Sequence, residues 1–424
     1  MRRRKFLGTV TTAVGLSTVS LPRVGSDIEQ HENTALEAHE KTIQNVTHDQ
    51  TTPDTTKESL PSLDRFVVEG RQLDDLEAVS HWSGDVTPAD ERSFTGSQSL
   101  KVQSSTGKAI AVGDFSDDPL DLQGNDLSLA YYPDLPDAQP SVYLELFAPD
   151  RANRLQLKGT YDGHVSMDWH RLDIAPHKTF GEPDLSRVER VRFIINADEI
   201  RVWIDDLRAH TSPDTGKVIL RFDDGSLRHY TDYFPLLSEY GYPAIAGVVI
   251  NGVGNDSQMS IEQLQEMEAS GWEILSHTMD HDAITKLSAD ELRADLEASA
   301  EWLTEHGFGH STEYFITPYN NYDGDSLDVL DEHIDLAFTG GGPTNAALTS
   351  PLTVPAVNPE KEETQTLRAI DLAAEHRQLI VLMFHGINTD RLEAILAHIQ
   401  SKGDQLDVIT ASQLHETLVQ LHGL

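Results

Sequence analysis

The 424-residue sequence contains no cysteine. Disulfide bonds, thiol nucleophiles, cysteine-ligated zinc and a lipid-modified cysteine are therefore excluded. Basic residues are scarce as well, with 32 Lys and Arg against 70 Asp and Glu, and the formal net charge is -38. Because such a surface repels nucleic acid, we exclude a nucleic-acid partner. The acidic excess is typical of a protein adapted to high salt, where the Debye length falls to about 3 Å and self-repulsion is screened. An ordinary acidic protein is the alternative.

Long apolar segments are also missing. Residues 1–25 contain Arg3-Arg4-Lys5-Phe6-Leu7 followed by an apolar core too short to span a bilayer. This pattern resembles a twin-arginine export signal, and an ordinary secretory signal is the alternative. We therefore predict a secreted or cell-surface protein without a stable transmembrane segment beyond the signal. Residues 26–63 are polar and nearly free of aromatic side chains, which predicts a flexible linker.

Residues 64–210 are predicted to form an all-β sandwich. Short alternating runs are separated by Gly, Asp and Pro at 100–103, 109–112, 127–131, 142–147, 154–157, 191–195 and 201–207. Residues 94–102 and 200–208 resemble the first and last strands of jelly-roll carbohydrate-binding modules. In such a module Asp205 or Asp206 is a candidate calcium ligand. The candidate sugar-stacking aromatics are Trp82, Tyr131, Tyr132, Trp169 and Trp203, although core packing is favoured for any single one of them.

Residues 216–424 alternate apolar strands with amphipathic helices. Strands are expected at 218–222, 244–250, 273–276, 314–317, 336–339 and 379–384, and helices at 227–240, 260–270 and 288–306. Repeated units of this kind build a parallel sheet or barrel with functional groups at the carboxyl ends of the strands. Asp223, Asp224, His277, Pro318 and His385 all fall at or just past such ends.

Asp224, His277 and His281 are candidate metal ligands. The two histidines are four residues apart behind one predicted strand, and Asp224 follows another. One Asp and two His are a sufficient ligand set for a divalent metal that keeps one coordination position open. The sequence therefore predicts a catalytic metal site.

Four short motifs in this region, taken together, resemble a known family. They are Phe222-Asp-Asp-Gly225, His277-Thr-Met-Asp-His281, Thr317-Pro-Tyr319 and Leu382-Met-Phe-His385. In this order they resemble the polysaccharide deacetylases of the NodB-homology type, carbohydrate esterase family 4, whose fold is a distorted (β/α) barrel. The resemblance implies a divalent metal, zinc in the first instance, on Asp224, His277 and His281. It also implies Asp223 as the base, His385 as the acid, the Tyr319 N–H at the oxyanion and Leu382 beside the acetyl methyl group.

Two family features are absent. The third motif lacks its usual Arg, which pairs with the catalytic Asp, and no Asp-Trp pair of the fourth motif occurs near residues 338–342. Residues two apart in a strand share a face, so Arg221 is placed to point the same way as Asp223. We hypothesise that Arg221 keeps Asp223 ionised and oriented.

The sequence thus favours an exported metal-dependent hydrolase that removes N-acetyl groups from a polysaccharide or glycan. An O-acetyl polysaccharide esterase is one alternative, since the same site could cleave either bond. A catalytically impaired glycan-binding protein of the cell surface is the other, and the missing Arg is its support. The sequence gives neither the glycan nor the oligomeric state.

Overall fold

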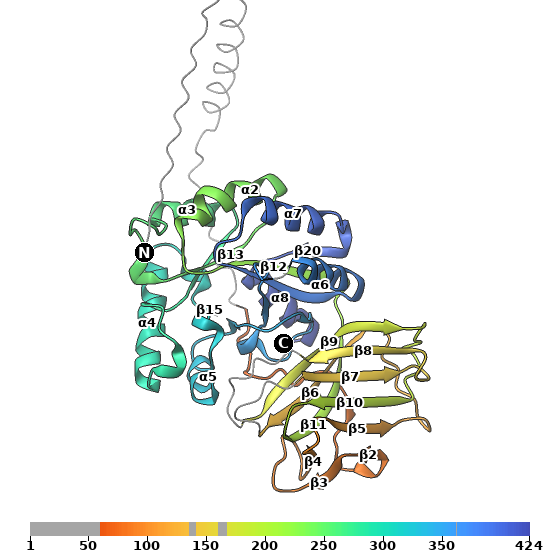
Figure 1. Ribbon diagram of the computed structural model, residues 1–424. Coiled ribbons are helices and arrows are strands. Elements are labelled where there is room, and N and C mark those ends of the chain that lie inside the picture. The colour runs from red at the N-terminus through yellow and green to blue at the C-terminus, as the bar shows by residue number, and fades with distance from the viewer. Residues whose placement is uncertain (1–59, 135–140, 160–167, 362) are drawn as a thin grey trace, which may run out of the picture. The chain divides into compact units, whose positions relative to one another are not determined.

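The computed structural model describes residues 60–134, 141–159, 168–361 and 363–424 (Figure 1). The predicted signal and nearly all of the predicted linker lie outside the described residues. The described residues form one compact unit, which contains two separate sheets. Within the described residues, no helix has the length and apolar character needed to cross a membrane.

The first sheet is entirely antiparallel, in the order β2-β5-β10-β7-β8-β9-β6-β11-β4-β3, with β1 paired to β11. Tyr131 on β6 and Phe193 on β10 are not on neighbouring strands, yet their ring centroids lie 6.5 Å apart. The sheet therefore folds back on itself around a single apolar core. Its strands are β1 (Arg71–Asp74), β2 (Trp82–Gly84), β3 (Val86–Ala89), β4 (Ser99–Ser104), β5 (Ala109–Asp114), β6 (Asn125–Pro133), β7 (Ser141–Phe147), β8 (Arg154–Gly159), β9 (His170–Phe180), β10 (Arg190–Asn196) and β11 (Ile200–Thr211).

The long strand β9 is not among the predicted strands. It contains Pro176, which cannot donate a ladder hydrogen bond, and its register with β8 shifts between Gln156 and Leu157, opposite this proline. The irregularity hides the alternation that the other strands display. Most of the other predicted strands are confirmed to within a few residues.

The polar and aromatic candidates of this sheet are mostly structural. Four of the five predicted stacking aromatics are buried, and only Trp169 is half-buried. Asp205 accepts backbone N–H groups of Phe94 and Thr95. Asp206 accepts the guanidinium groups of Arg171 and Arg208. These donors give both carboxylates a structural role, and the calcium site stays a prediction.

The second sheet is parallel except for one strand, in the order β16-β15-β14-β13-β12-β19-β17. β18 pairs with β19, β20 pairs with β12, and an isolated bridge joins Phe338, at the end of β16, to Val354. Since Val354 leads into β18, the sheet curls back towards β19. The strands are β12 (Gly216–Phe222), β13 (Ile245–Val248), β14 (Glu273–Ser276), β15 (Tyr314–Ile316), β16 (Leu336–Phe338), β17 (Thr344–Asn345), β18 (Ala356–Val357), β19 (Gln378–Phe384) and β20 (Leu406–Val408).

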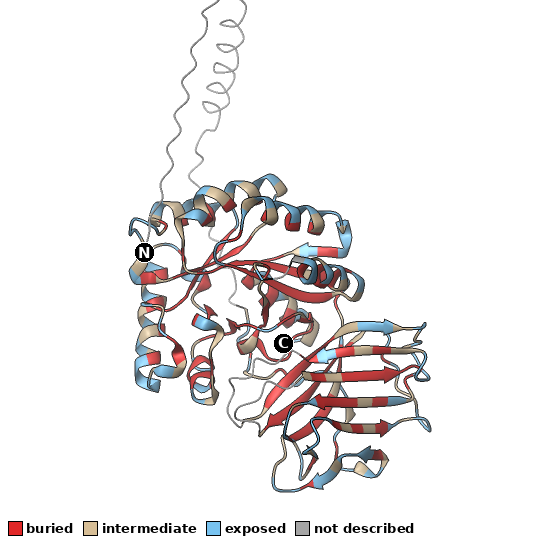
Figure 2. Cartoon of the chain, in the orientation of Figure 1, coloured by how far each residue is buried: buried red, intermediate tan, exposed pale blue. Residues whose placement is uncertain are grey.

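Helices cover this second sheet, with their outer faces exposed and the strands buried (Figure 2). Ser260 and Ser288 form the capping boxes expected at the starts of α3 and α4. The single helix expected at 227–240 is instead a π-helical turn, η2 (His229–Tyr233), followed by α2, and Pro235 lies in the first turn of α2. The helices are α2 (Phe234–Tyr240), α3 (Ile261–Ala269), α4 (Ala289–Glu305), α5 (Gly324–Leu330), α6 (Glu363–His376), α7 (Thr389–Gln400) and α8 (Ala411–His422).

Candidate active site

The predicted site residues follow four strands of the second sheet. Asp223 and Asp224 come after β12, and His277 comes after β14. Tyr319 lies three residues past β15, and His385 comes directly after β19. Since these strands are parallel, their carboxyl ends meet at one edge of the sheet. The sequence places all of these side chains at that edge, and the structure brings them together there.

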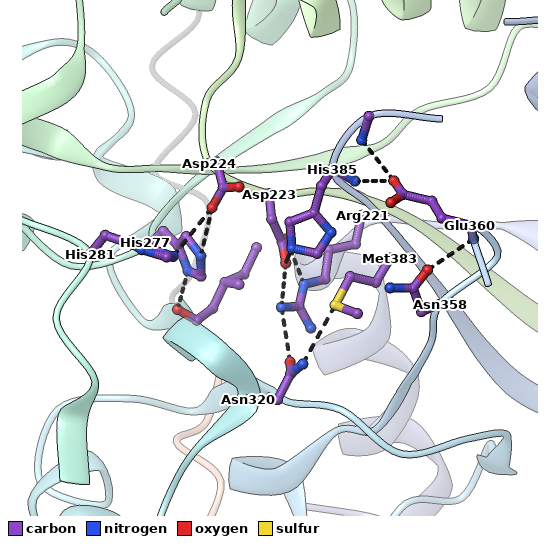
Figure 3. A network of polar contacts seen from close by, with 12 residues as sticks. Arg221, Asp223, Asp224, His277, His281, Asn320, Asn358, Glu360, Met383 and His385 are labelled. Carbon is purple, nitrogen blue, oxygen red and sulfur yellow. Dashed lines mark hydrogen bonds and ion pairs between the residues drawn. The ribbon is translucent and has the colours of Figure 1, made fainter. Parts of the chain in front are cut away.

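Asp224, His277 and His281 face one another with their ligand atoms within 4.8 Å (Figure 3). Asp224 Oδ1 lies 3.5 Å from His277 Nε2 and 3.3 Å from His281 Nε2. His277 Nδ1 donates to the Ile316 carbonyl oxygen at 2.8 Å, which orients the ring with Nε2 towards Asp224. Both imidazole Nε2 atoms therefore point at Asp224 Oδ1, a buried atom that has no hydrogen-bond partner within 3.5 Å at good geometry among the described residues. This donor set fits a divalent cation.

The protonation states also suit a cation. The polar contact with His277 is the largest influence on Asp224 and lowers its pKa to about 2, so this carboxylate is ionised at neutral pH. Burial is the main reason that the pKa of His281 is lowered, which favours the neutral imidazole that binds metals.

Asp223 is paired with Arg221 in the interior. Arg221 donates from Nε to Asp223 Oδ1 at 2.8 Å and from Nη2 to Oδ2 at 2.7 Å. Its Nη1 donates to the Thr339 carbonyl at 2.9 Å, and Nη2 lies 3.4 Å from Asn320 Oδ1. Both Arg221 and Asp223 are almost completely buried. Arg221 is therefore placed to hold the Asp223 carboxylate, as its hypothesised role requires.

His385 lies beside this pair, on a turn that is itself held in place. Its Nε2 is 3.8 Å from Asp223 Oδ2, and its side chain is 41% exposed. Glu360 Oε1 accepts the backbone N–H groups of His385 and Gly386 at 2.6 and 2.7 Å. From the other side, the Tyr233 hydroxyl donates to the Ile387 carbonyl at 2.7 Å. Sequence reasoning missed Glu360 because residues 358–361 form a turn without periodicity or motif.

One predicted residue is misplaced. Leu382 is buried in the apolar core with Leu220 and Phe222, and it is not among the residues that line the site cavity. Arg221 pairs in register with Met383, so Met383 lies on the site face of β19 and contacts the Asn320 amide nitrogen through its sulfur. Because side chains alternate along a strand, Leu382 points to the opposite face. The prediction that Leu382 lies beside the acetyl group is therefore wrong.

The remaining candidates line one cavity of about 220 Å³. Tyr319 is 61% exposed at its mouth, with its ring centroid 4.5 Å from that of His281. Five residues around the cavity have a left-handed backbone, a conformation that is strained for side chains other than glycine and is concentrated at functional sites. They are Asp224, Thr278, His281, Tyr319 and Asn320. The full lining consists of Arg221, Asp223, Asp224, His277, His281, Thr317, Tyr319, Asn320 and His385.

Comparison with known proteins gives this site a family context. Residues 210–333 match the family described as polysaccharide deacetylase, a range that includes the three metal-ligand candidates but ends before His385. A putative polysaccharide deacetylase, YxkH of Bacillus subtilis, is 28% identical over 115 residues, which is 27% of this chain and 41% of that protein. The poly-beta-1,6-N-acetyl-D-glucosamine N-deacetylase of Staphylococcus aureus is 28% identical over 127 residues, 27% of this chain and 43% of that protein.

The chain thus spans about two-fifths of the length of these curated relatives. Among solved structures, a family 4 acetyl xylan esterase from Clostridium thermocellum in complex with a cobalt ion is 17% identical, with a TM-score of 0.35. That similarity covers 47% of this chain and 90% of the esterase chain.

Proposed function

We propose that this protein is an exported, metal-dependent hydrolase that removes N-acetyl groups from a polysaccharide or glycan. The match of residues 210–333 to the polysaccharide deacetylase family supports this proposal. The observation on which the proposal rests is the shared cavity. A three-residue cation site and an arginine-paired carboxylate line it together, with a histidine at its edge.

Asp224, His277 and His281 would hold the metal, for which we propose zinc. A divalent cation bound there would supply a water of lowered pKa and polarise the acetyl carbonyl. The unpartnered Asp224 Oδ1 and the two Nε2 atoms around it support this assignment.

Asp223 and His385 each carry out one of the two proton transfers. Asp223 takes the proton from the attacking water, and Arg221 holds the carboxylate in place by two hydrogen bonds. His385, partly exposed and close to Asp223, donates a proton to the departing amine. The backbone N–H of Tyr319 stabilises the oxyanion. Arg221 thereby takes the place of the arginine missing from the third motif, which argues against an impaired protein.

The first sheet would hold the glycan. Its fold, which turns back around one core, supports a jelly-roll module, and the curl of the second sheet supports a distorted barrel. Trp169 is the one predicted stacking aromatic that is not buried, so we assign it the contact with the sugar. The twin arginines and the excess of acidic residues support export and high-salt operation.

Acetate release from N-acetylglucosamine oligomers and from acetylated xylan tests this function. We expect release from the oligomers in high salt with zinc added back, and none from the His277→Ala variant. Release from xylan alone would favour the O-acetyl esterase. A protein that releases no acetate from any acetylated polymer while it binds glycan would favour the impaired alternative.

A further inference from the structure

One short pattern of the sequence has no part in the proposed catalysis. Asn255-Asp256-Ser257 has the form Asn-x-Ser/Thr, with a residue other than proline in the middle. In exported proteins this pattern is the acceptor for N-linked glycosylation, and its asparagine lies on the surface. Among the described residues the pattern occurs at this position alone. A second copy, Asn45-Val46-Thr47, lies outside the described residues.

Asn255 lies on an exposed turn. Residues 254–257 are all exposed, in the segment that connects β13 to α3. The Asn255 carbonyl accepts the Gln258 N–H at 2.9 Å, so the two residues between them form a tight turn. A Cβ placed on the neighbouring Gly254 would meet nothing within 4 Å, which shows that the space beside Asn255 is open. The asparagine is therefore accessible in the folded chain.

The two side chains that the modification uses are free. Within the described part of the chain, neither the Asn255 amide nor the Ser257 hydroxyl makes a hydrogen bond. An amide that donated to the protein would have to give up that bond before it could react. The turn is held by its backbone instead, since the Ser257 carbonyl accepts from Leu227 N at 2.9 Å and Met259 N donates to the Gly225 carbonyl at 3.0 Å.

Access in the folded state is the condition that this site has to meet. The signal predicted for residues 1–25 is of the twin-arginine type, a route that carries folded proteins. A glycosyltransferase outside the cytoplasm therefore meets the folded chain, in which a buried asparagine could not react. Asn255, exposed on a turn, meets the condition.

We propose that Asn255 carries an N-linked glycan. The inference rests on the proposed function in one respect, because the protein has to be exported to meet the transferase. The donor is a sugar linked to a lipid phosphate. Asn255 Nδ2 forms a C–N bond with the anomeric carbon of that sugar and gives up one proton to a base of the transferase. The C–O bond to the phosphate breaks, and the phosphate leaves with the bonding electrons.

The glycan would stand beside the candidate metal site. Asn255 lines a hollow of about 360 Å³ together with Asp224 and His281. The modification would therefore add a bulky polar group at the edge of the active site.

Mass spectrometry of the full chain purified from its native host tests the inference. A protease that cuts after glutamate releases residues 240–262, which contain Asn255 and no other acceptor pattern. We expect this peptide to carry added sugar mass in the wild type and to lose it in Asn255→Gln and in Ser257→Ala. Ser257→Thr is the matched control, because it keeps the hydroxyl group and should keep the added mass.

Analysis of the protein from the cytoplasm and from outside it separates failure of this inference from failure of the proposed function. An unmodified peptide in exported protein would overturn the inference while export stands. Added mass that persists in Asn255→Gln would place the sugar elsewhere and would also overturn it. Protein found only in the cytoplasm, with this peptide unmodified, would refute both export and the modification.

Discussion

Arg221 and Asp223 form an ion pair that is almost fully removed from water. Burying two charges costs several kcal/mol each, and the cost is offset only when the geometry is good and the remaining donors are satisfied. Here both carboxylate oxygens are engaged by one guanidinium, whose free end reaches the Thr339 carbonyl. The pair is therefore stable as a unit, and each partner depends on the other.

Replacing Arg221 alone should harm both stability and catalysis. We expect Arg221→Met to lower the free energy of unfolding by about 3–5 kcal/mol, since it leaves a buried charge unpaired. In the remaining folded protein, Asp223 loses the two hydrogen bonds that orient it, so kcat should fall. Urea denaturation and the rate of acetate release measure the two effects.

The double variant Arg221→Met with Asp223→Leu is the matched control for this pair. It removes both charges, so it should regain most of the lost stability while remaining inactive. A single variant with wild-type stability and an unchanged kcat would contradict the role of Arg221.

At the scale of single residues, the sequence predicts which side chains lie together at the site, but it predicts less well which face of a strand a side chain occupies. The candidate metal ligands and Asp223 could be predicted to lie together because each follows an apolar strand that ends abruptly. The place of Leu382 in a motif predicts that it lies beside the acetyl group. Residues two apart in a strand share a face, however, and Met383, two residues before His385, is the one on the face of the site. The strand period was sufficient to avoid that error.

At the scale of elements, the turn after β19, which carries His385, is held in place by residues outside the strand. Glu360 binds two successive N–H groups of this turn, and Tyr233 at the end of η2 binds the carbonyl of Ile387. The position of the His385 imidazole therefore depends on two other segments. Neither contact could be predicted, because no local pattern links residue 360 or residue 233 to residue 385.

Weakening the contact between Glu360 and the His385 turn should lower kcat without changing the affinity for zinc. We expect Glu360→Gln to lower kcat by roughly 10-fold, because hydrogen bonds to a charged acceptor contribute about 1.5–3 kcal/mol. KM and zinc affinity should stay close to wild-type values, as the ligands lie on other strands. Glu393→Gln, on the exposed face of α7, is the control. Equal losses of activity in both variants, or a loss of zinc affinity in Glu360→Gln, would argue against a positioning role.

At the scale of the whole molecule, the two sheets are joined through buried acids. Asp173 on β9 accepts the backbone N–H and the hydroxyl of Thr349 at 3.0 and 2.8 Å, and Ser350 donates to the Arg171 carbonyl. Burial is the main reason that the pKa of Asp173 is raised to about 7 and that of Asp126 to about 6. These contacts span about 176 positions along the chain, so no sequence pattern indicates them.

This interface makes stability depend on pH. Between about pH 4 and pH 7 the folded protein keeps a proton on Asp173 that the unfolded chain has released, so this contribution to stability falls as pH rises. Asp173→Asn keeps an acceptor for the Thr349 N–H and removes the titration. We expect the difference in unfolding free energy between variant and wild type to grow in favour of the variant across that window.

Chemical denaturation at pH 4, 5.5 and 7 measures this difference, with exposed Asp256→Asn as the control. A difference that does not vary with pH would show that Asp173 does not titrate in the folded protein.

The central claim is that Asp224, His277 and His281 hold a divalent cation on which acetate release depends. Zinc titration into metal-depleted protein, with bound metal and acetate release followed together, tests it most directly. We predict that both rise in parallel to one zinc per chain in the wild type and that both are lost in His277→Ala. Acetate release that persists at full rate in metal-free protein would contradict the account.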